Sequence, residues 1–72
     1  MSSGASELDE ALLVAHSEGN RTALVGLYLQ AAEQAQKDAV PFFLTQAWIF
    51  ALEIGDARAA LIEAALVETG HA

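Results

Sequence analysis

Apolar residues recur along the chain at spacings of three and four, which places them on one face of an α-helix. Short stretches of glycine or polar capping residues separate four such segments. The pattern predicts an all-α fold without strands, with four short antiparallel helices at residues 6–18, 20–36, 40–54 and 56–69. We expect residues 1–5 to form a disordered N-terminal lead and residues 6–72 to form a single helical domain.

Glycine followed by a polar residue marks two of these boundaries, at Gly19-Asn20 and Gly55-Asp56. Glycine readily adopts the left-handed conformation that ends a helix, and an Asn or Asp side chain can cap the next one. We therefore expect Gly19 and Gly55 to have positive φ. Each pair should join two helices in a tight αα-hairpin.

The other boundaries carry weaker signals. Ser6, with Asp9 three residues later, can cap the first helix, and Asp38 is a possible cap for the third. Pro41 fits the first turn of that third helix, where its missing N–H is tolerated. Gly26 lies inside the second helix and costs roughly 1 kcal/mol relative to alanine. It is either a tolerated imperfection or a point of close approach by a large side chain such as Trp48.

The two glycine turns are 36 residues apart, and other residues match at the same offset. Ala11 corresponds to Ala47 and Ala15 to Ala51. Each half of the chain thus has the order helix, glycine turn, helix. An ordinary four-helix bundle whose pattern resembles a repeat by chance is the alternative interpretation.

This period, with paired helices, resembles the tetratricopeptide class of helical repeats. The resemblance rests on the turns Glu-Gly-Asn at 18–20 and Ile-Gly-Asp at 54–56, on Tyr28 at an aromatic position and on Ala31 at a small one. Trp48 and Ala64 depart from the pattern, which prefers a small residue and an aromatic there. Two units are also fewer than the three that such stacks need. The resemblance implies a helical-hairpin module that binds proteins through its exposed faces.

The composition narrows the function classes. The chain has 72 residues, with ten acidic residues, three basic residues and a formal charge of −7. Nucleic acids and anionic membranes are bound through clustered basic residues, so we expect neither as a partner. The first seven residues have no basic segment followed by an apolar one, and the apolar stretch at 42–52 is shorter than the roughly 20 residues of a membrane span. We therefore expect a soluble, cytoplasmic protein.

Few residues point to catalysis or metal binding. The chain has no cysteine. No carboxylate stands three or four residues before His16, and the Glu-x-x-His formed by Glu68 and His71 is a single copy interrupted by Gly70. No nucleophile triad or phosphate-binding motif is present. We expect a non-catalytic protein with no metal and no cofactor.

The third predicted helix is apolar on two sides. Leu44, Ala47, Trp48 and Ala51 can pack into the chain's own core. The opposite side is the candidate interface, and it consists of Phe42, Phe43, Gln46, Ile49, Phe50 and Glu53. Glu53 is expected to be partly buried and paired with Arg58 or with a second chain.

Four short helices do not readily cover both sides of the third one, and a large exposed apolar patch is unusual for a monomer. We therefore expect a protein–protein interaction module that forms a homodimer through this helix or docks another protein. The alternative is a small subunit or ligand-binding component of a larger enzyme assembly, with a pocket beside Trp48 and Tyr28. A third possibility is that the rest of the chain wraps the helix completely.

Overall fold

The computed structural model describes residues 4–69, and the side chains of residues 7–69. It contains four α-helices, α1 (Gly4–Glu18), α2 (Arg21–Gln34), α3 (Val40–Ile54) and α4 (Arg58–Glu68). Within the described residues there is no strand, so the prediction of an all-α fold with four helices is confirmed. Helix α1 begins two residues before the expected start, and the first three residues of the expected lead lie outside the described part. The side chain of Ser6 and all of Gly70 and His71 lie outside it too.

The two hairpin turns have the same hydrogen-bonded geometry, 36 residues apart. Gly19 and Gly55 have φ values of +66° and +67°, as predicted. After α1, the N–H groups of residues 19 and 20 donate to the carbonyls of residues 16 and 15, at 3.2 and 2.9 Å. After α3, residues 55 and 56 donate to residues 52 and 51, at 3.3 and 2.8 Å. This pair of bonds is a Schellman motif, which satisfies carbonyls that the helix end leaves free.

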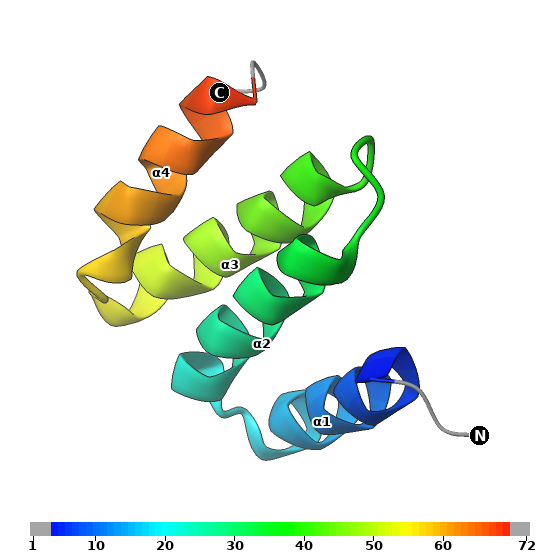
Figure 1. Ribbon diagram of the computed structural model, residues 1–72. Helices are drawn as coiled ribbons and strands as arrows, with labels where there is room; N and C mark the ends of the chain where they lie inside the picture. Colours follow the sequence, from blue (N-terminus) through cyan, green and yellow to red (C-terminus); the bar gives the residue numbers. More distant parts are fainter. Residues whose placement is uncertain (1–3, 70–72) are drawn as a thin grey trace.

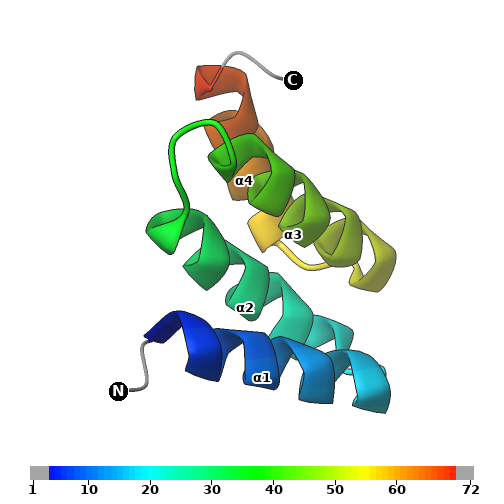
Figure 2. The same cartoon turned by 90° about the vertical axis from the view of Figure 1, so that its right-hand side faces the viewer.

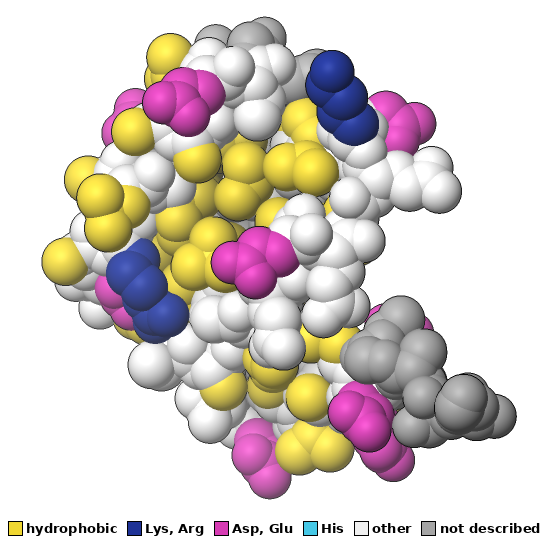
Figure 3. Space-filling view, in the orientation of Figure 1, with side chains coloured by type: hydrophobic (Ala, Val, Ile, Leu, Met, Phe, Trp, Pro, Cys, Tyr) yellow, Lys and Arg dark blue, Asp and Glu magenta, His cyan; other side chains and the backbone are white. Residues whose placement is uncertain are grey.

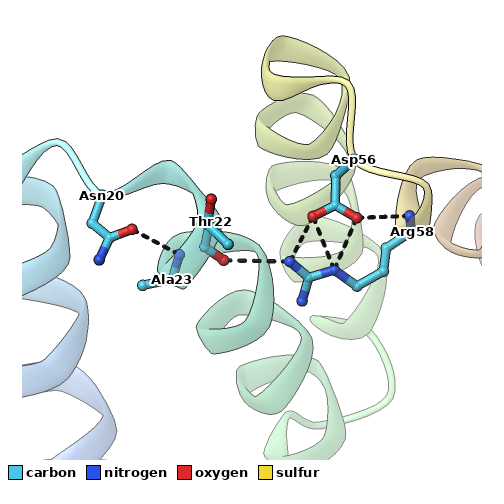
Figure 4. A network of polar contacts seen from close by, with 5 residues as sticks. All are labelled: Asn20, Thr22, Ala23, Asp56 and Arg58. Atoms are coloured by element: carbon cyan, nitrogen blue, oxygen red, sulfur yellow. Dashed lines mark hydrogen bonds and ion pairs between the residues drawn. The ribbon is translucent and has the colours of Figure 1, made fainter.

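The caps that follow these turns differ. The Asn20 side chain accepts a hydrogen bond from the Ala23 N–H at 3.1 Å and caps α2, as expected (Figure 4). The Asp56 carboxylate accepts from the Arg58 N–H at 2.8 Å. Because this bond reaches only two residues ahead, Asp56 orders the turn, and α4 begins at Arg58 rather than at residue 56.

The start of α3 differs from the prediction in one respect. Asp38 does not cap the helix, because the residue at the N-cap is Ala39 and no side chain bonds there. The chain is turned instead by the N–H groups of Ala39 and Val40, which donate to the Gln36 carbonyl at 2.8 and 3.1 Å. Pro41 lies in the first turn, as predicted.

Among the described residues, the backbone of each helix lies close only to the backbones of its neighbours in the chain, in the order α1, α2, α3 and α4 (Figures 1 and 2). In a closed four-helix bundle the first and last helices also pack together, but α1 and α4 do not. The Cα atoms extend 35 × 27 × 13 Å, so the molecule is a thin, open series of antiparallel helices. Both end helices therefore have a face that nothing else in residues 4–69 covers.

The core is divided between the helix pairs. The larger cluster joins α2, α3 and α4 through Val25, Ala32, Leu44, Ala47, Ala51, Ile62 and Leu66. The buried residues outside it, on α1 and α2, are Leu8, Ala15, Leu24 and Ala31. The buried positions Leu8 and Ala15 of α1 correspond to Leu44 and Ala51 of α3 at the offset of 36. The first helix of each hairpin thus buries the same face.

Candidate interaction surface

Helix α3 contacts α2 and α4, and its core side is the one that the sequence predicts. Leu44, Ala47 and Ala51 are buried, and Trp48 is half-buried against the main cluster. The two alanines leave room for the neighbouring helices to approach closely.

Two of the six residues of the expected interface pack inside the molecule against Tyr28 of α2. The ring of Phe50 stacks on Tyr28 with centroids 5.9 Å apart and planes inclined by 11°. Phe43 stacks on the same ring at 6.3 Å and meets the ring of Phe42 edge-on at 5.2 Å. Offset stacking at these distances is favourable, and both rings are half-buried. Phe43 and Phe50 thus hold α3 against α2.

His16 at the end of α1 extends this aromatic group, although it was not among the residues predicted to lie at α3. Its Nε2 lies 3.0 Å from the Tyr28 hydroxyl, and its ring meets Phe50 edge-on at 5.9 Å. The contact brings the exposed end of α1 close to α3 although the two helices do not pack directly. The sequence does not predict this contact, because residues 16, 28 and 50 lie on three different helices and come together only in the tertiary structure.

Glu53 does not pair with Arg58, which was one of its two expected partners. Its carboxylate binds Arg21 of α2 at 2.8 Å, and the two side chains are about half-exposed (49% and 54%). Arg58 is bound instead by Asp56, with its Nη2 2.7 Å from the carboxylate (Figure 4). An exposed pair such as the one between Arg21 and Glu53 adds little stability. It does neutralise the only charge on α3.

The pair formed by Asp56 and Arg58 is the better ordered one. The Arg58 guanidinium, and then its backbone N–H, hold the pKa of Asp56 at about 2, below its ordinary 3.8. The side-chain hydrogen bonds between the Arg58 guanidinium and the Asp56 carboxylate raise the pKa of Arg58. The guanidinium also donates to the Thr22 carbonyl at 3.4 Å, so it ties the start of α4 to α2.

Gly26 lies beneath this guanidinium, not beneath Trp48. The nearest heavy atom to the position of an added Cβ is Nη1 of Arg58, at 3.6 Å, an ordinary contact distance. The close approach that the sequence offered as one interpretation therefore involves a flexible cationic side chain. An alanine at residue 26 fits in this space.

The outward side of α3 is apolar and exposed. Phe42, Ile49 and Leu52 expose 59%, 40% and 53% of their surface. With Thr45 they follow one another at spacings of three, four and three residues, so they form a single stripe. We call the following residues the α3 ridge: Phe42, Thr45, Gln46, Ile49, Leu52 and Glu53. Thr45 and Leu52 are the two members that the predicted interface omitted, although their spacings of four and three from Ile49 place them on the same stripe.

The free faces of the end helices mix apolar and acidic residues. On α1, Leu13 and Val14 are exposed (70% and 50%), and so are four acids, Glu7, Asp9, Glu10 and Glu18. On α4, Leu61 and Val67 are exposed (72% and 60%), together with Glu63 and Glu68. At the offset of 36, Glu7 of α1 occupies the place of Phe43, which packs on α2. An acid thus replaces the aromatic at the end of the series.

Hydrophobic side chains also gather between α4 and α2 (Figure 3). At one end of this region an open cavity of about 740 Å³ lies between the connection from α2 to α3 and the end of α4. Its lining consists of Gln36, Lys37, Asp38, Val40, Pro41, Glu68 and Thr69. Neither Trp48 nor Tyr28 lines this cavity, so it is not the pocket that the alternative interpretation requires.

No group of three or more His, Cys, Asp or Glu side chains among the described residues is arranged to hold a metal ion. No helix in this part of the chain is both long and apolar enough to cross a membrane. Comparison with protein-family models, curated proteins and solved structures found no match.

Proposed function

We propose that this protein is a non-catalytic protein–protein interaction module that forms a homodimer through the α3 ridge and acts in the cytoplasm. The observation that carries the proposal is the exposure of Phe42, Ile49 and Leu52 on one stripe. We regard the tetratricopeptide-like character as part of the proposal, because the turns at 19 and 55 share one geometry.

Charge favours the ridge over the ends of the series as the self-association surface. A chain of charge −7 repels its own copy wherever acidic faces meet. Head-to-tail stacking of α4 on α1 would bring Glu63 and Glu68 towards Glu7 and Glu10. The ridge carries a single charge, Glu53, which Arg21 neutralises. End helices with polar outer faces also cap natural helical repeats.

The size of the ridge indicates a weak dimer. Burying a fully exposed large aliphatic or aromatic side chain contributes roughly 1.5–3 kcal/mol. Phe42, Ile49 and Leu52 are about half-exposed, and a symmetric dimer buries all three on each of its two copies. The gain is on the order of 5–8 kcal/mol. The entropic cost of association is roughly 4–15 kcal/mol, so the ridge alone does not give a tight complex. We expect a dimer that dissociates on dilution and is populated at high micromolar concentration.

Sedimentation equilibrium across a concentration series tests the proposal. We expect the wild-type mass to rise towards that of a dimer, and Ile49→Glu to remain monomeric with unchanged helicity. The matched control is Leu13→Glu, which places the same charge at an exposed leucine of α1, away from the α3 ridge, and should still dimerise. A wild type that is monomeric at high micromolar concentration contradicts the proposal.

A further inference from the structure

We infer that the two copies pair along α3 in the antiparallel orientation, with the twofold axis at the level of Ala47. Phe42 of one copy then contacts Leu52 of the other, and Thr45 contacts Ile49. This inference rests on the proposed function, because it describes how the α3 ridge meets a second copy. The molecule that covers the α3 ridge is a second copy of this chain.

The register follows from the spacing of the stripe. Residues 42 and 52 are symmetric about residue 47, and so are residues 45 and 49. An antiparallel pair centred there therefore leaves no member of the stripe without an opposite residue. The stripe belongs to a helix of 15 residues, so the contact spans most of its length.

The charge of Glu53 does not oppose the antiparallel orientation. In the antiparallel pair Glu53 lies opposite the level of residue 41, so the two carboxylates are about 18 Å apart along the helix axis. That separation exceeds the Debye length of about 8 Å at physiological salt. Each Glu53 can also keep its bond to Arg21.

Side-chain size points to the same orientation. A parallel pair would set Phe42 against Phe42 and Thr45 against Thr45, which makes the contact wide at one level and narrow at the next. The antiparallel pair sets each large residue against one of different size. The Thr45 hydroxyl already donates to the Pro41 carbonyl at 2.7 Å, so it needs no partner when its methyl group meets Ile49.

Gln46 occupies the flank of the stripe close to the axis. In an antiparallel pair the same flank of the two helices lies on the same side of the contact, so the two Gln46 side chains are neighbours. In a parallel pair they lie on opposite sides, with the stripe between them. Gln46 therefore reports the orientation without any change to Phe42, Ile49 or Leu52.

Disulfide trapping in this cysteine-free chain tests the inference. We expect Gln46→Cys to form a covalent dimer on mild oxidation, because a disulfide needs Cβ atoms about 3.5–4.5 Å apart. Glu53→Cys is the matched control on the same flank, and it should give about tenfold less covalent dimer. An equimolar mixture of Phe42→Cys and Leu52→Cys should cross-link more than either variant alone.

Each contrary result has one meaning. Equal cross-linking of Gln46→Cys and Glu53→Cys overturns the antiparallel register, and so does a Phe42→Cys protein that cross-links by itself as well as in the mixture. A wild type that is dimeric while Gln46→Cys does not cross-link overturns the inference but leaves self-association in place. A monomeric wild type overturns both, and sedimentation of the same samples distinguishes these cases.

Discussion

Phe50 of α3 lies almost flat on the ring of Tyr28 of α2, with centroids 5.9 Å apart and an angle of 11° between the planes. One helical step away, Ile49 points into solvent with 40% of its surface exposed. Two adjacent residues of one apolar helix thus have different structural roles. Phe50 fixes the packing of two helices inside the molecule, and Ile49 belongs to the ridge that we propose as the dimer contact.

Alanine substitutions should separate these tasks. We expect Phe50→Ala to lower the free energy of unfolding by about 2–3 kcal/mol, because it leaves a half-buried cavity beside Tyr28. We expect Phe42→Ala to change it by less than about 1 kcal/mol in dilute solution, because Phe42 is mostly exposed. Urea denaturation at low protein concentration measures both values. Equal losses would show that α3 packs differently from this description.

Three glycines should respond to alanine with different signs. Gly55→Ala is expected to lower stability by about 1 kcal/mol, because alanine resists the left-handed conformation at φ +67°. Gly19→Ala should behave alike. Gly26→Ala is expected to raise stability by roughly 0.5–1 kcal/mol, because the site is helical and the nearest side chain is 3.6 Å away. Thermal or urea unfolding of the three variants measures the contrast, and a stabilised Gly55→Ala would contradict the turn.

The Asp56 carboxylate should make stability depend on acid pH. Its pKa in the folded protein is about 2, below the ordinary 3.8, because Arg58 donates to its ionised form. A group with a lowered folded pKa contributes stability above its unfolded pKa and loses that contribution as the pH falls towards the folded value. We therefore expect wild type to be more stable than Asp56→Asn at pH 7, with a difference that shrinks between about pH 4 and pH 2. A difference independent of pH would show that the ionised pair does not stabilise the turn.

Metal removal should leave the fold unchanged. The described residues contain no group of side chains that could hold a metal ion, and helix packing accounts for their order. We expect the melting temperature in excess chelator to equal that of the untreated protein, measured by circular dichroism at 222 nm. A clear fall in melting temperature, reversed by adding a divalent cation, would contradict this prediction.

Local signals in the sequence were sufficient for the helices and their turns. Gly19 and Gly55 were identifiable because only glycine enters the left-handed region at little cost, and that preference does not depend on the rest of the fold. The core side of α3 was identifiable as well, because Leu44, Ala47 and Ala51 share one helical face. Boundaries set by side-chain caps were less certain. Asp38 fits a cap by residue type, but backbone bonds to Gln36 turn the chain there.

The sequence by itself thus determined four helices, two glycine turns at an offset of 36 and an apolar third helix, since each depends on spacing within one segment. Only the tertiary structure decided which aromatic residues of α3 are covered. Phe42, Phe43 and Phe50 are the same residue type on one side of a helix, yet Tyr28 covers two of them and leaves the third exposed. The ion pairs between Glu53 and Arg21 and between Asp56 and Arg58 were likewise decided only by the tertiary structure. These pairings depend on the angle and register at which separate helices meet, and that geometry follows from the packing of the whole chain.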